Sequence, residues 1–513
     1  MSRLLLRGGR LVDPVAERDG RFDVLLEDGL VAEVGDRIEA GGARVFDASK
    51  LCVFPGFIDL HTHLREPGRE YAETIHTGLA AAAAGGFTAA CAMPNPSPVN
   101  DTREVCEFIR SRAAGARGAR QYPIGAITMG QKGQEMTAFG ELVETGAVAF
   151  SDDGHWLGGG LLRHAYEHAG LFSKAIVQHC EDPTLSFHSP MHEGAVSARL
   201  GLAGQPAMAE AVAVARDLLI AELTGGRLHV AHLSTARALE LVRRAKADGI
   251  AVTCEVTPHH LLLTDEEVAT SGFSTRTKMN PPLRETSDLL ALLAGIQDGT
   301  IDAIATDHAP HHADEKAVDF DSAPFGIVGL ETAASVVHDR LVARGRLGLD
   351  RFVSLFSAGP ARVFGLPGGT LAPGSPADVT LFDPEARWTV DPPKFVSKGR
   401  STPFAGWELV GAPAATTAAL PPCAPSSGSR SRSWFSSRRL FPLSPFPSGR
   451  SSSRLRRTSP TRRWRVWRRE RGHAASKWKS RRRAETSRGA STSSDSRRFP
   501  PRTGFATRSW CSR

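Results

Sequence analysis

The segment VFPGFIDLHTH, residues 53–63, is an apolar, strand-like run that ends in two histidines. Residues two apart on a β-strand point to the same face of the sheet, so His61 and His63 share a face. Because the rest of the run is apolar, we expect that face to line the interior of the domain. The segment therefore predicts a buried strand with two imidazoles at its C-terminal end.

Seven further apolar runs follow, separated by helical stretches rich in Ala and Leu. They are FTAACAMPN (87–95), YPIGAIT (122–128), AVAFSDD (147–153), AIVQHCED (175–182), RLHVAHLS (227–234), AVTCEVTPHH (251–260) and IDAIATDHAP (301–310). Strands that alternate with helices predict a parallel α/β fold, and eight strands fit a (β/α)8 TIM barrel. Most of the runs end in His, Asp or Asn, and the C-terminal strand ends build the active site in such barrels.

Two β-like flanks surround this region. The first fifty residues contain LLLRGGRLVD, FDVLLEDGLVAEVG and ARVFDA, and GTLAPGSPADVTLFDP spans residues 369–384. Since a short meander cannot close a core alone, we expect both flanks to build one small β-sandwich domain. The predicted organisation is 1–52 and 367–411 for the two parts of the small β domain, 53–366 for the TIM-barrel metallohydrolase domain, and 412–513 for a tail.

The tail differs sharply in composition from the rest of the chain. Residues 412–513 hold 25 Lys and Arg but 3 Asp and Glu, which leaves 38 basic and 52 acidic residues in 1–411. The net charge of +8 therefore comes from an excess of basic residues in the tail, because residues 1–411 are acidic. It does not indicate that residues 1–411 bind nucleic acid. Arg, Ser, Pro and Ala dominate the tail, a composition that predicts a disordered, protease-sensitive segment.

Three origins fit such a tail: a nucleic-acid-binding arm, a linker, or the product of a shifted reading frame. A frame slip in a GC-rich gene yields Arg, Pro, Ala, Gly and Ser codons, and the change in this chain is abrupt. We favour the shifted frame and expect no specific nucleic-acid binding.

Membrane association and secretion are not indicated. No apolar run reaches the roughly 18 residues that a membrane helix needs, and the N-terminus becomes charged too early for a secretory signal. Seven scattered cysteines without a Cys-x-x-Cys pair are no disulfide framework. We therefore expect a cytoplasmic protein.

Four further candidate metal ligands end other predicted strands: Asp153, His179, His232 and Asp307. Six nitrogen and oxygen ligands at one barrel mouth suit one or two divalent ions, with Zn²⁺ the expected metal. Asp152 and Asp153 are adjacent and face opposite ways, and the pattern does not decide which enters the mouth. His259 and His260 pose the same question, and we expect both to support or pack rather than ligate.

Nine motifs, in order, resemble those of bacterial class I dihydroorotases of the amidohydrolase superfamily. They are DLHTHLREPG (59–68), AMPNPSPV (92–99), FSDDG (150–154), QHCED (178–182), HVAHLST (229–235), EVTPHHLLL (255–263), KMNPPLR (278–284), ATDHAPH (305–311) and APFGIVGLET (323–332). The resemblance implies reversible, metal-dependent hydrolysis of (S)-dihydroorotate to N-carbamoyl-L-aspartate in de novo pyrimidine (UMP) biosynthesis. It stops near residue 411, where such proteins continue with another strand of the small domain, so we expect that strand to be lost.

The resemblance also implies residue roles. Two Zn²⁺ ions per subunit would be bound, one by His61, His63, Asp153 and Asp307, and the other by Asp153, His179 and His232, with Asp153 as the bridge. Asp307 would take a proton from the nucleophile and pass it to the ring nitrogen. Substrate would contact His63, Arg65, Asn95, Asn280, His311, Phe325 and Gly326, with Arg65, Asn95 and His311 at its carboxylate. A surface ion pair with Glu66 or Glu70 is the alternative role of Arg65.

Two alternatives to this function remain. Dihydropyrimidinases and allantoinases resemble the chain in layout, but they bridge their metals with a carboxylated lysine at the end of the fourth strand, where this chain has SDDG. An inactive scaffold for aspartate carbamoyltransferase would have lost metal ligands, and all six are present. Assembly with that partner, and a homo-oligomer, stay compatible with an active enzyme for a small-molecule substrate.

Overall fold

The computed structural model describes residues 3–418 and 441–442. The predictions for the tail, its disorder and its origin, therefore fall almost wholly outside the described residues. In the described part, none of the helices has both the length and the apolar character needed to cross a membrane.

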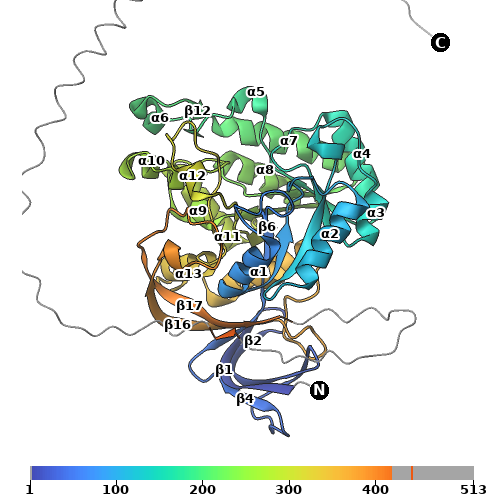
Figure 1. Cartoon of the computed structure of the whole chain (residues 1–513), viewed down its shortest axis with the longest axis vertical. Helices are drawn as coiled ribbons and strands as arrows, with labels where there is room; N and C mark the ends of the chain where they lie inside the picture. The colour runs from blue at the N-terminus through green and yellow to red at the C-terminus, as the bar shows by residue number, and fades with distance from the viewer. Residues whose placement is uncertain (1–2, 419–440, 443–513) are drawn as a thin grey trace, which may run out of the picture. The chain divides into compact units, whose positions relative to one another are not determined.

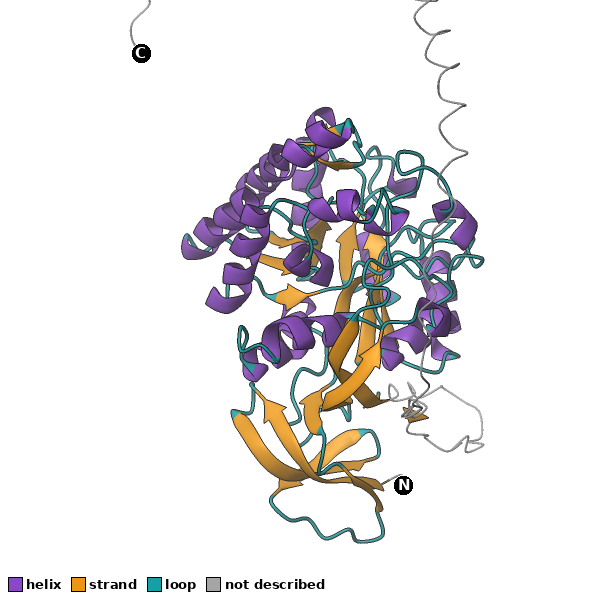
Figure 2. Ribbon diagram, turned by 90° about the vertical axis from the view of Figure 1, so that its left-hand side faces the viewer, coloured by secondary structure: helices purple, strands orange, loops and turns teal. Residues whose placement is uncertain are grey.

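Eight parallel strands form a nearly closed barrel (Figure 2). They are β6 (Phe57–Thr62), β7 (Phe87–Ala92), β8 (Arg120–Ala126), β9 (Ala149–Ser151), β10 (Ala175–Gln178), β13 (Arg227–Val230), β14 (Val252–Val256) and β15 (Ala303–Ile304). A parallel bridge between Thr62 and His308 links the first strand to the segment after the last. Each of the eight predicted runs supplies one strand of this barrel, so the predicted (β/α)8 barrel is confirmed.

Helices between the strands cover the outside of the barrel (Figure 1). The longer ones are α1 (Ile75–Ala84), α2 (Arg103–Ala114), α4 (Gly159–Gly170), α7 (Ala207–Thr224), α8 (Ala236–Ala247) and α11 (Thr286–Asp298). Thr74, Thr102 and Thr235 start three of them, because each hydroxyl accepts a backbone N–H of the first turn. These caps lie five to twelve residues after the preceding strand ends, so loops of that length between strand and helix can carry polar side chains.

Shorter elements occupy the loops and the last third of the chain. They are α3 (Phe139–Glu144), α5 (Pro183–Ser186), α6 (Ala195–Leu200), α9 (Pro258–Leu262), α10 (Glu266–Thr270), α12 (Ala313–Lys316), α13 (Ala333–Val337), α14 (Leu349–Val353), α15 (Gly359–Phe364), β11 (Met191–His192) and β12 (Gly204–Gln205). Figure 1 shows α5, α6, α10 and α12 at the same end of the barrel, opposite the small sheet.

Both flanks join in one mixed sheet, which confirms the composite β domain. Its strands are β1 (Arg3–Asp13), β2 (Arg18–Glu27), β3 (Leu30–Gly35), β4 (Arg44–Asp47), β5 (Cys52–Pro55), β16 (Val379–Thr389), β17 (Glu408–Thr417) and β18 (Phe441–Pro442). All eight are hydrogen-bonded into a single sheet instead of the two that a sandwich would have, because β1 pairs with β2, β4 and β5.

Two boundaries differ from those read in the sequence. The first apolar run splits at Gly56, so that β5 pairs with β16 in the small sheet and only β6 enters the barrel. At the other end, β17 runs past residue 411 to Thr417 and stays paired with β16, with Ala415 opposite Leu381. The expected loss of a strand after residue 411 is therefore wrong, because residues 412–417 supply the backbone pairing whatever their side chains.

A cluster of buried phenylalanines joins the barrel to the small sheet. Phe54 of β5 lies 5.9 Å from both Phe57 of β6 and Phe382 of β16, between ring centroids. Phe57 in turn lies 5.8 Å from Phe352 of α14, edge to face. Each ring is fully buried, which contributes roughly 1.5–3 kcal/mol per side chain. The cluster seals the end of the barrel opposite the candidate site.

Candidate metal centre and active site

His61 and His63 lie side by side at the carboxyl end of β6, as their spacing predicts. Both are buried, and their ring centroids are 5.3 Å apart. The Nε2 atoms of both rings turn toward Asp307, whose Oδ1 lies 3.6 Å from His61 and 3.1 Å from His63. These three side chains therefore come together from β6 and from the segment after β15, the two edge strands of the barrel sheet.

Asp152 and Asp153 follow β9 and point in opposite directions. Oδ1 of Asp152 accepts hydrogen bonds from the backbone N–H groups of Ile127 and Thr128, at 2.8 and 3.0 Å. Asp153 enters the mouth, where its Oδ1 lies 3.7 Å from Nε2 of His61. The structure therefore places Asp153, and not Asp152, among the candidate ligands.

His179 and His232 close the other side of the cluster. Nδ1 of His179 lies 2.9 Å from Nε2 of His232, and the ring centroids of His232 and His61 are 4.9 Å apart. Two overlapping groups have ligand atoms within 4.8 Å of one another: His61 with His63 and Asp307, and His61 with Asp153 and His232. His61 belongs to both groups, and His179 lies beside them through its contact with His232, so the six predicted ligands form one cluster.

The chemistry of this donor set fits a metal. Nε2 of His61 is buried and has no hydrogen-bond partner within residues 3–418, although two carboxylates lie just beyond hydrogen-bond range. A buried polar atom without a partner costs free energy unless another ligand occupies its lone pair. Imidazole nitrogens with carboxylate oxygens are the ligands that Zn²⁺ and similar divalent ions take.

Electrostatic coupling in the cluster is strong. Burial lowers the pKa of His61, but nearby carboxylates, Asp153 foremost, raise it more, to about 10. Burial raises the pKa of Asp153, whereas His61 and His63 lower it further, and the net shift is downward. Burial and the neighbouring His179 hold the pKa of His232 well below its ordinary value. Protons and a cation therefore compete for the same buried lone pairs.

Three site residues have a left-handed backbone, which side chains other than glycine rarely adopt. The φ angles are +59° at Arg65, +33° at His232 and +47° at Asp307. Such conformations cost about 1–3 kcal/mol each and persist where the surrounding structure enforces them. Each of the three follows a barrel strand, where a sharp turn directs its side chain into the mouth.

Arg65 is buried beside the cluster instead of forming a surface ion pair. Its Nε donates to the carbonyl of Pro310 at 3.1 Å. The alternative partner Glu66 is engaged by Arg112 Nε at 2.6 Å, and Glu70 accepts from the backbone N–H of Gly68. Burial lowers the pKa of Arg65 to about 10, which leaves it charged at neutral pH. The guanidinium is therefore a buried cation near the candidate ligands.

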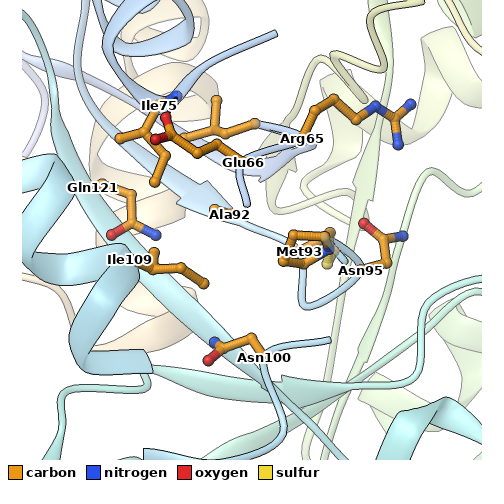
Figure 3. A pocket seen from close by; sticks show the side chains of 11 residues that line it. Arg65, Glu66, Ile75, Ala92, Met93, Asn95, Asn100, Ile109 and Gln121 are labelled. Atoms are coloured by element: carbon orange, nitrogen blue, oxygen red, sulfur yellow. Dashed lines mark hydrogen bonds between the residues drawn. The ribbon is translucent and has the colours of Figure 1, made fainter. Parts of the chain in front are cut away.

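Asn95 joins the two halves of the site. Its Oδ1 lies 2.8 Å from Nδ1 of His63, and its Nδ2 donates to Oδ2 of Asp153 at 3.0 Å. Figure 3 shows Asn95 and Arg65 on one side of a pocket whose opposite side is formed by Gln121 and Ile109. None of the six candidate ligands lines this pocket, so it is separate from the candidate metal site, although Asn95 belongs to the lining of the pocket and contacts two candidate ligands.

His311, predicted at the substrate carboxylate, lies close to Phe325 and Gly326, which are predicted at the substrate ring. Nε2 of His311 lies 2.8 Å from the carbonyl oxygen of Phe325. Burial lowers the pKa of His311 to about 4, so the ring is neutral at pH 7 and its Nε2–H can donate to that carbonyl. Gly326 has a φ of +123°, and a Cβ there would come within 2.9 Å of Ala309. Glycine is thus required for this loop to approach the end of β15.

Several supporting residues were missed in the sequence. Glu255 lies inside the barrel, with Oε1 3.1 Å from Nδ1 of His61 and Oε2 3.2 Å from Nε2 of His229. Glu181 lies 3.0 Å from Nε2 of His179. Two signals could have identified them. Glu255 is a carboxylate inside the apolar run AVTCEV, and Glu181 follows the candidate ligand His179 by two positions.

His259 and His260 lie on α9 and are buried. Nδ1 of His260 lies 2.8 Å from the Thr257 hydroxyl, and its Nε2 lies 3.0 Å from the carbonyl oxygen of Pro281. Neither histidine belongs to a group with metal-ligand geometry among the described residues. The contacts of His260 fit a supporting role, and the role of His259 stays a prediction.

A nearly closed parallel barrel with buried His and Asp clusters at its carboxyl mouth defines a hydrolase of the amidohydrolase type. A family model described as dihydro-orotase-like matches residues 50–238. The dihydroorotase of Anaeromyxobacter dehalogenans is 55% identical over 410 residues, which cover 80% of this chain and 94% of that protein. That of Pelotomaculum thermopropionicum is 53% identical over 416 residues, covering 81% and 96%. The chain belongs to the dihydroorotase family.

Solved structures with a similar fold include hydantoinases. The L-hydantoinase (dihydropyrimidinase) of Arthrobacter aurescens matches with a TM-score of 0.73 and 27% identity, over 81% of this chain and 95% of that one. The D-hydantoinase (dihydropyrimidinase) of a Thermus species matches with a TM-score of 0.71 and 28% identity, over 81% and 94%. Identity is about twice as high to the dihydroorotases, so sequence and not fold separates the two groups.

Proposed function

We propose that this chain hydrolyses (S)-dihydroorotate reversibly to N-carbamoyl-L-aspartate, with two Zn²⁺ ions bridged by Asp153. The entry of Asp153 into the mouth, 3.7 Å from His61, is the observation that supports this proposal most. A carboxylate at that strand end takes the place of the carboxylated lysine expected of a dihydropyrimidinase or allantoinase. The reverse reaction closes the pyrimidine ring in UMP biosynthesis.

The metals would be divided as the resemblance implies. His61, His63, Asp153 and Asp307 would hold one ion, and Asp153, His179 and His232 the other. When bound, such ions lower the pKa of water to about 7 and act as Lewis acids toward a carbonyl. Five of the six side chains are buried and His179 is partly buried, which supports this assignment because the site excludes most of the competing solvent.

Asp307 would act as the proton carrier. Its carboxylate lies 3.1 Å from His63 and faces the middle of the mouth, where a substrate carbonyl would have to sit. Water adds its oxygen to that carbonyl carbon, Asp307 accepts the proton released, and the same proton then goes to the ring nitrogen as the C–N bond breaks. The left-handed backbone of Asp307 also supports this role, because the fold accepts a strained residue at the position from which the carboxylate points into the mouth.

Arg65 would bind the substrate carboxylate, together with Asn95 and His311. A guanidinium holds a carboxylate through two parallel hydrogen bonds, and among residues 3–418 the hydrogen bond that Arg65 donates to protein is the one from Nε to the carbonyl of Pro310. Asn280, Phe325 and Gly326 would contact the ring, and His63 borders both metal and substrate. A cytoplasmic location, a homo-oligomer and assembly with aspartate carbamoyltransferase remain predictions from the sequence.

The test is turnover together with metal content. We expect purified full-length protein to contain Zn²⁺, to hydrolyse dihydroorotate, and to leave dihydrouracil, which lacks the carboxylate, nearly untouched. Prolonged chelation should abolish turnover and added Zn²⁺ should restore it. Full activity of metal-free protein, or a preference for dihydrouracil, would contradict the proposal.

A further inference from the structure

Glu181 links a candidate metal ligand to a candidate substrate contact. Its Oε2 accepts a hydrogen bond from Nδ2 of Asn280 at 2.6 Å and lies 3.0 Å from Nε2 of His179. The carboxylate is buried. Two side chains from distant loops, one after β10 and one before α11, therefore meet on a single oxygen atom.

The other oxygen of Glu181 is held as well. Oε1 accepts the hydroxyl hydrogen of Ser186, the last residue of α5. Asp182 caps the start of this helix, because its side chain accepts the backbone N–H of Thr184 at 2.9 Å. Because both oxygens have partners and the preceding strand is part of the barrel, the carboxylate has one fixed position.

This contact decides how Asn280 presents its amide. The Nδ2 group is directed at Glu181, and Oδ1 is buried with no hydrogen-bond partner in the described part of the chain. A free amide oxygen accepts a hydrogen bond and cannot donate one. The Glu181 carboxylate also lies against Nε2 of His179. The other ring nitrogen of His179, Nδ1, therefore faces Nε2 of His232, at 2.9 Å.

We propose that Glu181 is a positioning residue that orients Asn280 to accept a ring N–H of the substrate and orients His179 toward the metal centre. The inference rests on the proposed function and adds a chemical preference to it. A cyclic amide with an N–H at this position would satisfy the buried Oδ1 of Asn280. A ring methylated at that nitrogen would leave the oxygen unpaired and would be rejected.

The main experiment compares two variants of Glu181 with a matched control. Glu181→Ala removes the acceptor, whereas Glu181→Gln keeps one neutral oxygen, which accepts weaker hydrogen bonds than a carboxylate. Asp182→Asn removes the neighbouring charge, and its side-chain oxygen can still cap α5. Zn²⁺ affinity is measured by titration against a competing chelator, and KM and kcat are measured separately at saturating Zn²⁺.

We expect Glu181→Ala to weaken the binding of one Zn²⁺ by about 10- to 100-fold and to raise KM for dihydroorotate at saturating Zn²⁺. Glu181→Gln should recover part of both losses, and Asp182→Asn should behave as wild type. Zn²⁺ affinity and KM within twofold of wild type in Glu181→Ala would overturn the proposal.

A double-mutant cycle isolates the link to the substrate. Asn280→Ala should raise KM without changing Zn²⁺ affinity, and adding Glu181→Ala should raise KM little further, because Glu181 acts on the ring through Asn280. Additive effects on KM would refute the link. A wild-type protein that binds Zn²⁺ but does not hydrolyse dihydroorotate would instead reject the proposed function.

Folding of the variants is checked by thermal melting. If Glu181→Ala does not fold, Ser186→Ala serves in its place, since it removes only the bond to Oε1 and leaves the carboxylate present. It should shift Zn²⁺ affinity and KM in the same direction by a smaller factor. A folded Ser186→Ala protein with neither shift would then count against a fixed carboxylate.

Discussion

Nδ1 of His61 lies 3.1 Å from Oε1 of Glu255, below the mouth of the barrel. The other oxygen of Glu255 lies 3.2 Å from Nε2 of His229. Burial raises the pKa of Glu255, but the hydrogen bonds to His229 and His61 lower it further, to about 2. An ionised carboxylate thus holds the Nδ1–H of His61 and leaves its Nε2 lone pair for the mouth.

Glu255→Gln should weaken metal binding. A neutral amide cannot accept from both imidazoles, so His61 loses its preferred orientation, and we expect Zn²⁺ affinity to fall by about 10- to 100-fold. The measurement is metal content after dialysis at fixed free Zn²⁺. Glu240→Gln, at an exposed pair with Arg244 on α8, is the control. Equal metal content in both variants would count against this role.

Asp307→Asn tests the proton carrier. The amide keeps an oxygen for the metal but cannot take up a proton near neutral pH, so kcat should fall by at least about a hundredfold. Metal content and melting temperature should stay close to wild type. The control is Asp314→Asn, since that side chain is 91% exposed. If the Asp307 variant turns over at a near wild-type rate, another base must be sought.

Arg65→Lys should raise KM for dihydroorotate by at least about tenfold, because one ammonium cannot reproduce two parallel hydrogen bonds to a carboxylate. Residual turnover of dihydrouracil should not change, since that ring has no carboxylate. Steady-state kinetics with both compounds gives the comparison, with Arg103→Lys on the surface of α2 as control. An unchanged KM would assign the carboxylate to other groups.

Lys316 provides a pH-dependent stability test. It is buried on α12, where its amine donates to the carbonyl of Pro324 at 2.8 Å, and burial lowers its pKa from 10.5 to about 7. Between these values the unfolded chain binds the proton and the folded chain does not, so the stability contribution of Lys316 rises with pH.

Lys316→Met should therefore flatten the rise in melting temperature between about pH 7 and pH 10. Melting curves at several pH values test this, with Lys394→Met as the control because that side chain is 73% exposed. The same pH dependence in Lys316→Met and wild type would show that the amine stays protonated when buried.

Truncation tests the end of the small sheet. A chain that stops after residue 418 keeps all of β17, including the bond from the Thr416 hydroxyl to the carbonyl of Ala83 at 2.8 Å. Stopping after residue 411 removes the pairing of residues 412–417 with β16. We expect the shorter chain to lose on the order of 3 kcal/mol of unfolding free energy, measured in urea. Equal stability of the two chains would make residues 412–417 dispensable.

Sequence alone determined the features that depend on neighbouring residues. The spacing of His61 and His63, and the eight apolar runs ending in polar side chains, predicted the barrel and the set of residues that meet at its mouth. Strand periodicity and parallel connections are local rules, and they need no knowledge of distant contacts. The catalytic and binding roles of those residues remain predictions.

Only the tertiary structure decided the features that depend on distant partners. Asp153 enters the mouth because backbone N–H groups of the preceding strand end hold Asp152, about 25 residues away in the chain. Glu255 reaches His61 across 194 positions, and β17 continues past residue 411 because β16 offers it a hydrogen-bonding edge. Alternating side chains look equivalent in sequence, and the energy of hydrogen bonds made across the fold selects between them.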